Sequence, residues 1–494
     1  MNQNADNAGG RQLLGQPIGL ANLFLTEMWE RFTFYGMRAI LVLLLVDQVA
    51  SGGLGIDDKT ATAIYGLYTA AVYLVALPGG YIADRVIGAQ RAVLAGGVLI
   101  TLGNVMLGLA GGATAFYIGL IVIIAGVGLL KPNISAIVAG LYPEGGARRD
   151  AGFTIFYMGI NLGAFIAPLI VAPVAAAYGW SAGFLCAAAG MALGVVQFLS
   201  TRHWLAGAGA APALPPGQAP DWKPTIVGVV VAIACVAALA LGVVEVSPVM
   251  LARATGAAIA LMALLYFAWI LLFGGLDPVE KKRVGAIIVL FIACAAFWSG
   301  FEQAGSSLNL FAERYTDRLV GSWEIPSGIF QSLNPVFILL FAPVFSALWV
   351  ALARRNLDPS APVKFALGLI IMGSGFLVMV QAAHLVAGGM KAAPYWLVLT
   401  YMLHTMGELC LSPVGLSNIT KLAPARYVGQ MMGIWFLATS LGNLAAGLIA
   451  GEFDAENVAA MPGQYLHIVA FAVGVGIITL LLSGPVKRWM GGVK

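Results

Sequence analysis

The feature that most limits the fold of this chain is a series of apolar runs separated by short polar breaks. A membrane-spanning helix needs about 20 mostly apolar residues, because each residue of an α-helix adds about 1.5 Å along the axis. Fourteen runs reach that length, at residues 20–50, 60–84, 90–110, 113–141, 150–178, 181–201, 224–245, 254–275, 282–316, 327–353, 362–386, 394–422, 427–450 and 464–486. The sequence therefore predicts an all-α membrane protein with fourteen transmembrane helices.

The composition supports lipid as the solvent of most of the chain. Of the 494 residues, 60% are apolar and only 10% are charged, whereas about a quarter of the residues in soluble domains are charged. A chain of this length could form roughly three soluble domains. Because it has too few polar side chains to cover such domains, one large helical bundle with membrane lipid around it is the better interpretation.

The sequence lacks the motifs that are typical of several classes of function. The net charge of +4 is small, and no basic cluster alternates with aromatic residues, so no nucleic-acid partner is expected. The four cysteines lie singly in apolar runs without metal-ligand spacing, and no catalytic Ser/His/Asp or Cys/His set or phosphate-binding loop is present. We therefore expect no enzyme, no metal and no cofactor. A membrane enzyme or a receptor is a weak alternative, and no obligatory protein partner is evident.

The distribution of basic residues predicts the topology. If the polar segment 1–19 stays in the cytoplasm, the segments predicted outside carry only five bases of the 26 in the chain, namely Lys59, Arg253, Arg314, Arg318 and Lys391. Most of the others then fall on the cytoplasmic side, as the positive-inside rule requires. An even number of helices places both termini in the cytoplasm, and the location expected is a bacterial-type inner membrane.

The runs fall into two groups of six. We expect a cytoplasmic segment 1–19, an N-terminal six-helix bundle at 20–201, a C-terminal six-helix bundle at 282–486 and a cytoplasmic tail at 487–494. Residues 202–281 are predicted to form a cytoplasmic linker and a two-helix hairpin. Two halves packed around a central cavity are typical of transporters. The two spans of the hairpin are almost entirely apolar, so a peripheral position facing lipid is expected for it.

Seven charged side chains lie at membrane depth, away from the ends of the predicted spans. They are Glu27, Glu30, Arg31, Arg38, Lys131, Glu302 and Glu408. A charge at membrane depth costs ~3 kcal/mol or more, so each of them should face protein or water and is a candidate functional residue. Simpler roles stay open: a salt bridge at a helix entrance for Glu27 and Arg31, snorkelling for Lys131, and an interhelical bond for Glu302 or Glu408.

The first span places its charges on one side. Glu27, Arg31, Tyr35 and Arg38 follow a spacing of i, i+4, i+8 and i+11, which puts them on one stripe of a helix, with Glu30 at its edge. Across the chain, four intramembrane carboxylates face three bases. One carboxylate is therefore expected to favour its protonated form, which predicts coupling of transport to protons.

Four segments resemble a known family. Residues Glu27 to Arg38 read Glu-Met-Trp-Glu-Arg-Phe-Thr-Phe-Tyr-Gly-Met-Arg, which resembles the ExxERFxxYG signature of the proton-dependent oligopeptide transporter family of the major facilitator superfamily. Residues 79–88, 156–163 and 407–413 resemble further segments of the same family. The resemblance implies a major facilitator fold of two six-helix bundles, with two extra helices between the halves in many bacterial members.

The resemblance also implies a function. Members import di- and tripeptides together with protons, so protons would be the coupling ion and peptides and membrane lipid the partners. A drug efflux antiporter or a proton-coupled transporter of another small solute stays an alternative. Many relatives carry a histidine in the second span, whereas His203, His384, His404 and His467 lie elsewhere. Carboxylates would therefore have to carry the proton.

Carried over to this sequence, the family's motifs imply roles for particular residues. Arg38 and Lys131 would attract the peptide carboxylate, and Glu408, supported by Ser412, would hold the peptide amino terminus. Asn161 and Asn334 would bind the peptide backbone. Side-chain pockets would be lined by Tyr35, Tyr73, Tyr157, Trp298 and Trp435. For each aromatic residue taken alone, ordinary packing is the simpler role, above all for Tyr73 and Trp435.

The remaining implied roles concern coupling and gating. Glu27, Glu30, Arg31 and Glu302 would couple transport to protons. Glu302 would pair with Arg38 at an outer gate, and Glu408 with Lys131 at an inner gate. Asp84 and Arg85 would form an inner-face latch between the two halves.

Overall fold

The computed structural model describes residues 12–13, 15–110, 112–143, 146–212, 214, 219–243, 246–453 and 457–492, without the side chains of residues 147, 240, 413 and 416. Most of the predicted segment 1–19 and the end of the predicted tail 487–494 lie outside these residues. The chain divides into two compact units. The N-terminal unit comprises Met1–Ile40 and Leu74–Val246, and the C-terminal unit comprises Leu41–Tyr73 and Ser247–Lys494.

The N-terminal unit is built from helices. A short antiparallel pair, β1 (Gln12–Leu13) and β2 (Gln16–Pro17), precedes α1 (Gly19–Val46), which continues into the other unit. The other elements of the unit are α3 (Ala76–Ile82), the π-helical turn η3 (Ala83–Ile87), α4 (Ala89–Leu109), α5 (Ala113–Gly140), α6 (Gly146–Tyr178), α7 (Trp180–Ser200), the turn η4 (Arg202–Leu205) and α8 (Lys223–Ala240).

The C-terminal unit contains the remaining elements. They are η2 (Val49–Ser51), α2 (Asp58–Leu74), α9 (Pro248–Phe273), α10 (Pro278–Phe301), η5 (Glu302–Gly305), α11 (Ser307–Tyr315), the antiparallel pair β3 (Leu319–Val320) and β4 (Trp323–Glu324), η6 (Ser327–Ser332), α12 (Leu333–Arg354), α13 (Ala361–Ala387), α14 (Tyr395–Leu422), η7 (Ala425–Tyr427), α15 (Val428–Ala450), η8 (Val458–Ala460) and α16 (Met461–Trp489).

Every predicted span coincides with helical structure, so the all-α prediction is confirmed. In the described part of the chain, 11 helical stretches are long and apolar enough to cross a membrane. The other three predicted spans correspond to α1, α8 and α14. Helix α1 falls outside the 11 because it carries four charged side chains, and the apolar stretch of α8 is short, at Lys223–Leu239.

The predicted span 282–316 is not one continuous helix. Helix α10 ends at Phe301, the 3-10 turn η5 follows at Glu302–Gly305, and α11 starts at Ser307. The break falls in a polar stretch, Glu302-Gln303-Ala304-Gly305-Ser306-Ser307, which the prediction counted as part of one long span. The break places Glu302 at the C-terminal end of α10, where the helix carbonyls carry partial negative charge.

Helices α4 and α5 pack through glycine. A Cβ added to Gly96 would lie 2.5 Å from the carbonyl oxygen of Gly126, and one added to Gly126 would lie 2.7 Å from the carbonyl oxygen of Gly96. Real side chains cannot approach so closely, so only glycine lets these two backbones meet. Small residues at helix contacts are the usual means of packing in membranes, where lipid supplies no hydrophobic drive between helices.

Helix α2 packs within the C-terminal unit along its length. Ala63 and Ala70 form an apolar cluster with Ala252 of α9 and Leu444 of α15. Ser440 Oγ donates a 3.0 Å hydrogen bond to the carbonyl oxygen of Ala70. Near the start of the helix, Asp58 accepts two hydrogen bonds of 2.5 and 2.8 Å from Arg314 of α11. Helix α2 is therefore an integral part of this unit.

The bundle boundaries predicted from the sequence stay a prediction. The two units are defined by their internal contacts, and they assign residues 41–73 to the C-terminal unit. The predicted hairpin at 224–275 is also divided between them.

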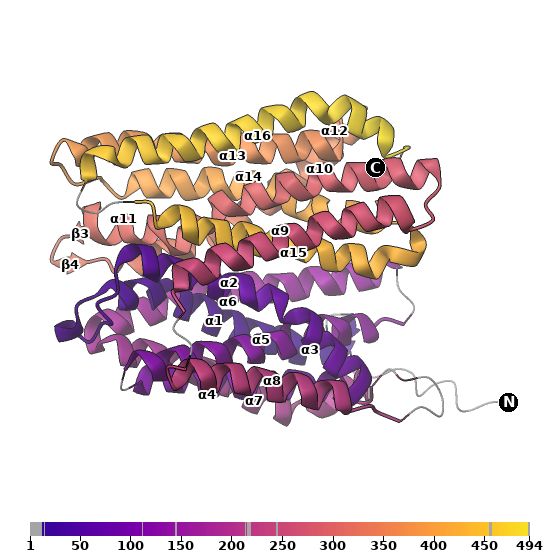
Figure 1. Ribbon diagram of the computed structural model, residues 1–494, viewed down its shortest axis with the longest axis horizontal. Helices are drawn as coiled ribbons and strands as arrows, with labels where there is room; N and C mark the ends of the chain where they lie inside the picture. Colours follow the sequence, from indigo (N-terminus) through magenta and orange to yellow (C-terminus); the bar gives the residue numbers. More distant parts are fainter. Residues whose placement is uncertain are drawn as a thin grey trace. The chain divides into compact units, whose positions relative to one another are not determined.

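The two helices of this hairpin differ in exposure. Most side chains of α8 are exposed, as expected for a lipid-facing helix. Helix α9 instead runs beside α15 in Figure 1 and buries Ala252, Ile259 and Ala263.

The α4–α5 contact makes a testable prediction. Replacing Gly126→Leu should lower the stability of the protein by about 1–3 kcal/mol, because the new side chain would overlap the backbone of α4. Gly474→Leu on α16 is the matched control, since no atom lies within 4 Å of a Cβ at that position. Thermal unfolding in detergent would measure both variants, and equal melting temperatures would contradict the tight contact.

Candidate functional site

The charges predicted within the spans are enclosed by protein. Glu27, Glu30, Arg31, Arg38 and Glu302 are each 6% exposed or less. Two further charged residues, Lys131 and Glu408, are partly exposed. A salt bridge open to water at the entrance of α1 does not fit such burial. The charged side chains therefore occupy protected positions in both units.

In α1, the guanidinium of Arg31 forms ion pairs with two carboxylates. Arg31 Nε lies 3.1 Å from Glu27 Oε1, one helical turn away, and also pairs with Glu30 Oε2. Lys131 of α5 is near enough to add its positive charge to the surroundings of Glu27. The acidic cluster Glu27–Glu30–Arg31 thus has two acids and one base of its own, with a second base nearby.

In each acid of this cluster, one carboxylate oxygen accepts no hydrogen bond from the described residues. Glu27 Oε2 and Glu30 Oε1 are buried and have no hydrogen-bond partner among the described residues. A buried carboxylate oxygen without a donor is costly. A proton bound there would remove negative charge and supply a hydroxyl that can donate, so the geometry suits proton uptake.

The apolar side of α1 fixes the cluster in place. A Cβ on Gly163 of α6 would lie 2.2 Å from the carbonyl oxygen of Met28, so glycine is needed for this helix contact. Phe32 packs against Gly190 of α7, and Thr33 Oγ1 donates a 2.9 Å hydrogen bond to the carbonyl oxygen of Ala187. The uncharged residues of the signature at 27–38 thus anchor α1 on α6 and α7.

The other predicted residues of the N-terminal unit occupy different settings. The Arg38 guanidinium lies 5.6 Å from the centre of the Tyr35 ring, within the range of a cation–π contact. Asn161 is buried, and its Nδ2 donates a 3.0 Å hydrogen bond to the carbonyl oxygen of Tyr157. The Tyr157 side chain is 45% exposed. Of this pair, Tyr157 offers the more accessible surface to a ligand.

In the C-terminal unit, Glu408 of α14 is held by a neighbouring helix. Asn334 Nδ2 of α12 donates hydrogen bonds of 2.9 Å to Glu408 Oε2 and 3.0 Å to Thr405 Oγ1. Thr405 was not predicted, although its position three residues before Glu408 places it on the same helix face. Ser412 Oγ has no hydrogen-bond partner among the described residues. The support of Glu408 therefore comes from Asn334.

The predicted aromatic residues of the C-terminal unit differ in their surroundings. Trp435 is buried: a Cβ on Gly415 would lie 2.5 Å from its ring, and the Phe365 ring packs edge-on against it at 6.1 Å. This favours the packing role for Trp435. Trp298 and Tyr73 are partly exposed, and Trp298 packs edge-on against Phe301 at 5.3 Å. These two keep surface for contact with a ligand.

Asp84 and Arg85 lie in the π-helical turn η3, and both are exposed. The turn ends at Gly88, whose φ of 83° is one that favours glycine. Gln90 then anchors the chain: its backbone N–H donates to the carbonyl oxygen of Gly209, and its Nε2 donates to that of Ala208. The turn is thus held from one side, and the latch role of its charged pair stays a prediction.

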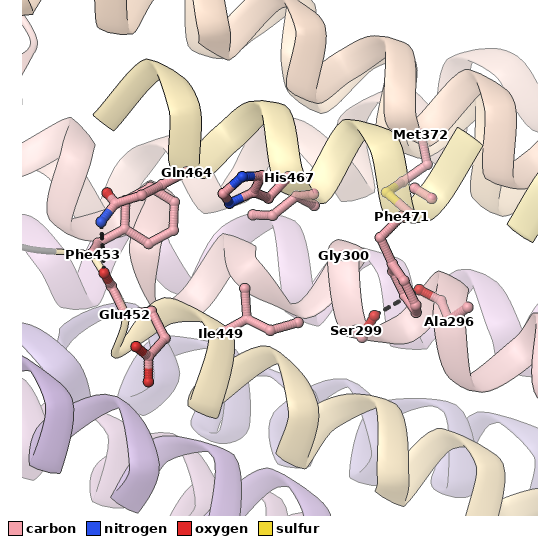
Figure 2. A pocket seen from close by; sticks show the side chains of 12 residues that line it. Ala296, Ser299, Gly300, Met372, Ile449, Glu452, Phe453, Gln464, His467 and Phe471 are labelled. Carbon is pink, nitrogen blue, oxygen red and sulfur yellow. Dashed lines mark hydrogen bonds between the residues drawn. The ribbon is translucent and has the colours of Figure 1, made fainter. Parts of the chain in front are cut away.

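A separate cavity lies in the C-terminal unit (Figure 2). Its volume is about 270 Å³, and it is lined from α10, α13, α15 and α16 together with the residues just after α15. Most of its lining is apolar, with Glu452, Gln464 and His467 as polar members. None of the residues predicted for the peptide site lines it. It therefore does not serve as the candidate site.

The acidic cluster leads to a prediction about stability. Arg31→Met should destabilise the protein by about 3–5 kcal/mol, because it leaves two buried carboxylates without the guanidinium between them. Adding Glu27→Gln and Glu30→Gln should restore most of the loss. Thermal unfolding in detergent would compare the variants. An Arg31→Met protein as stable as the unmodified one would show that the cluster does not depend on this charge.

Comparison with known proteins identifies the family of the chain. Residues 90–466 match the sequence profile described as PTR2, POT family. The chain is 42% identical over 508 residues to the peptide transporter YePEPT of Yersinia enterocolitica, an alignment that covers 100% of this chain and 99% of the relative. It is 36% identical over 503 residues to a di-/tripeptide transporter of Lactococcus lactis, with 99% of both chains covered.

Solved structures give the same result. A crystal structure of the peptide transporter POT in complex with sulfate matches with a TM-score of 0.91 and 40% identity over 100% of both chains. A POT family transporter in complex with 5-aminolevulinic acid matches with a TM-score of 0.87 and 34% identity, covering 96% of this chain and 98% of that one. The predicted fold is thereby confirmed, and the chain belongs to the POT family of membrane transporters, as the signature at residues 27–38 predicts.

Proposed function

We propose that this chain is a proton-coupled symporter that imports di- and tripeptides by alternating access. The observation that carries the proposal is the set of buried ionisable side chains in both units of a chain that aligns end to end with named peptide transporters. Such side chains are costly in a membrane and are kept where they bind substrate or ions. No soluble cofactor is required, since protons would supply the driving force.

The charges match the chemistry of a short peptide. Every zwitterionic peptide has an ammonium group and a carboxylate. Arg38 and Lys131 of the N-terminal unit would attract the carboxylate, while Glu408 of the C-terminal unit would bind the ammonium group. Asn334 supports this role, because its hydrogen bond fixes the position of the Glu408 carboxylate. Complementary charges of this kind favour peptides over solutes that carry a single charge.

Side-chain tolerance would come from the aromatic residues. Tyr157, Trp298 and Tyr73 keep exposed ring surface, and aromatic surfaces accept apolar and polar side chains with little discrimination. Tyr35 lies against Arg38, so it would contact the substrate close to the peptide carboxylate. Trp435 would not contact the substrate but would support α14 by packing against it.

The acidic cluster of α1 would carry the coupling proton. Glu27 and Glu30 share one guanidinium, and each has a buried oxygen that accepts no hydrogen bond from the part of the chain that the structure describes. Uptake of one proton would neutralise the excess negative charge of this cluster, and a change of access from one side of the membrane to the other would let it leave. Glu302 would take part as the carboxylate of the C-terminal unit.

The predicted gate pairs extend this proposal. Arg38 with Glu302, and Lys131 with Glu408, each combine a base of the N-terminal unit with an acid of the C-terminal unit. Formation of one pair and separation of the other would accompany each change of access. The inner-membrane location and the cytoplasmic position of both termini belong to the same proposal, supported by the distribution of basic residues.

Uptake by purified protein in liposomes would test the function. A labelled dipeptide should accumulate when an inward proton gradient is imposed. Glu408→Gln should lower uptake at least about tenfold, because a hydrogen bond to a charged group contributes about 1.5–3 kcal/mol. Glu452→Gln is the control, since this exposed carboxylate pairs with Lys59 and Arg253 and has no role in the proposed site.

The role of the acidic cluster has a separate test. Glu30→Gln should keep counterflow exchange of dipeptide across the membrane but lose accumulation against a gradient, since exchange does not require proton release. Both activities would be measured in the same liposomes. Normal accumulation by Glu30→Gln and by Glu408→Gln would refute the assignment of these residues.

Competition distinguishes peptide import from drug efflux. Excess unlabelled dialanine should block uptake of the labelled dipeptide, because it carries the same two terminal charges. An amphipathic cationic drug should block it much less. The opposite order of inhibition would favour an efflux antiporter.

A further inference from the structure

Glu302 lies in a short turn that is held from several sides. The turn η5, Glu302–Gly305, separates α10 from α11 and is buried throughout. Gln303 Nε2 donates a 3.3 Å hydrogen bond to the carbonyl oxygen of Ala446 in α15. Tyr401 Oη of α14 donates a 3.3 Å hydrogen bond to the carbonyl oxygen of Ala304. Two residues of the turn are therefore fixed by bonds from α14 and α15.

Helix α2 supplies the contact to Glu302 itself. Tyr65 is fully buried, with an exposed fraction of 0%, and its Oη donates a 3.3 Å hydrogen bond to Glu302 Oε2. Gly305 makes room for this phenol, because a Cβ at that position would lie only 2.0 Å from Tyr65 Oη. The sequence alone does not indicate a role for Tyr65, since aromatic residues are common in buried helices.

The backbone of α2 is fixed just after this tyrosine. Gly66 comes so close to Gly447 of α15 that a Cβ on Gly66 would lie 3.1 Å from the Cα of Gly447. Four residues after Tyr65, the carbonyl oxygen of Thr69 accepts a 3.5 Å hydrogen bond from Asn443 Nδ2. These contacts fix the position of the backbone that carries the phenol.

A phenol suits a carboxyl group that gains and loses a proton. Its hydroxyl can donate to the ionised carboxylate, and its oxygen can accept from the protonated acid. This matters for Glu302, which stands at the C-terminal end of α10, where the helix dipole disfavours negative charge. A donor facing the carboxylate offsets that effect. The proton remains on Glu302 or leaves it, and the tyrosine keeps its own.

We propose that Tyr65 is a positioning residue for proton coupling: its phenol holds the carboxyl group of Glu302 in one place in both protonation states. The proposal rests on the proposed function in that it assumes a coupling role for Glu302. It assigns to α2 a part in coupling through a side chain that does not touch the peptide or carry the proton.

The test compares accumulation with exchange. Tyr65→Phe keeps the ring and removes only the hydroxyl. We expect the ratio of proton-driven accumulation to counterflow exchange of a labelled dipeptide to fall about tenfold, the size that corresponds to the loss of a hydrogen bond to a charged group. Gly305→Ala should act in the same direction, because its methyl group would displace the phenol.

A control of the same chemistry is available. Tyr465→Phe also removes a buried hydroxyl from the C-terminal unit, where the ring packs against Phe376 and Phe453. It should leave the ratio unchanged. A wild-type ratio in Tyr65→Phe, measured beside this control, would overturn the proposal.

A second readout needs no substrate. Infrared spectra of the reconstituted protein at two pH values should contain a carboxyl band that is lost in Glu302→Gln, shifted in Tyr65→Phe and unmoved in Tyr465→Phe. Tyr401 of α14 also donates a hydrogen bond to the turn, at the backbone carbonyl of Ala304, and the band of Tyr401→Phe would be recorded beside that of Tyr65→Phe.

The two readouts separate the possible failures. If the unmodified protein accumulates no dipeptide, the proposed function fails. The infrared band would still test the contact between Tyr65 and Glu302. If no band depends on Glu302, or if Tyr65→Phe leaves the band in place, the positioning role is wrong even when peptide transport is normal.

Discussion

The cost of a charge inside a membrane governs how this chain is built. Every ionisable side chain kept at that depth must gain a partner, and the structure supplies partners from neighbouring helices or from the same helix. Arg31 lies between two carboxylates of α1, and Asn334 of α12 holds Glu408. These polar contacts limit where the helices can lie, so the surrounding apolar residues are arranged around them.

Close backbone contacts make these partnerships geometrically possible. Gly163 brings α6 against α1 beside the acidic cluster, and Gly305 leaves space for the hydroxyl of Tyr65. An added methyl group on Gly163 would overlap the backbone of α1, so these two helices would have to separate, whereas one on Gly305 would displace the phenol of Tyr65. The glycines therefore contribute to function without carrying any reactive group, because they set the distances at which charged and polar groups meet.

Much of the fold could be predicted from the sequence, because apolar runs of membrane length are a strong signal, and the signature at 27–38 identified the family. The individual charges of the site were also found, since a lone Glu or Arg in an apolar run stands out. The break of α10 at Glu302, the membership of α2 in the C-terminal unit and the Tyr65 contact were not predicted. The break falls in the polar stretch 302–307, which was counted as part of one long span. The other two features depend on packing between segments distant in sequence, and the type of a tyrosine or alanine in a helix does not indicate which residue it will contact.

The placement of α2 affects how the polypeptide can fold as it is made. Residues 41–73 leave the ribosome early, but their packing partners in α9, α11 and α15 are synthesised much later. Domains commonly fold in order from the N-terminus during synthesis. Here the first-made half must keep one of its early helices available until the second half has entered the bilayer. Insertion of this protein is therefore expected to finish late, by closure of contacts across a long stretch of chain.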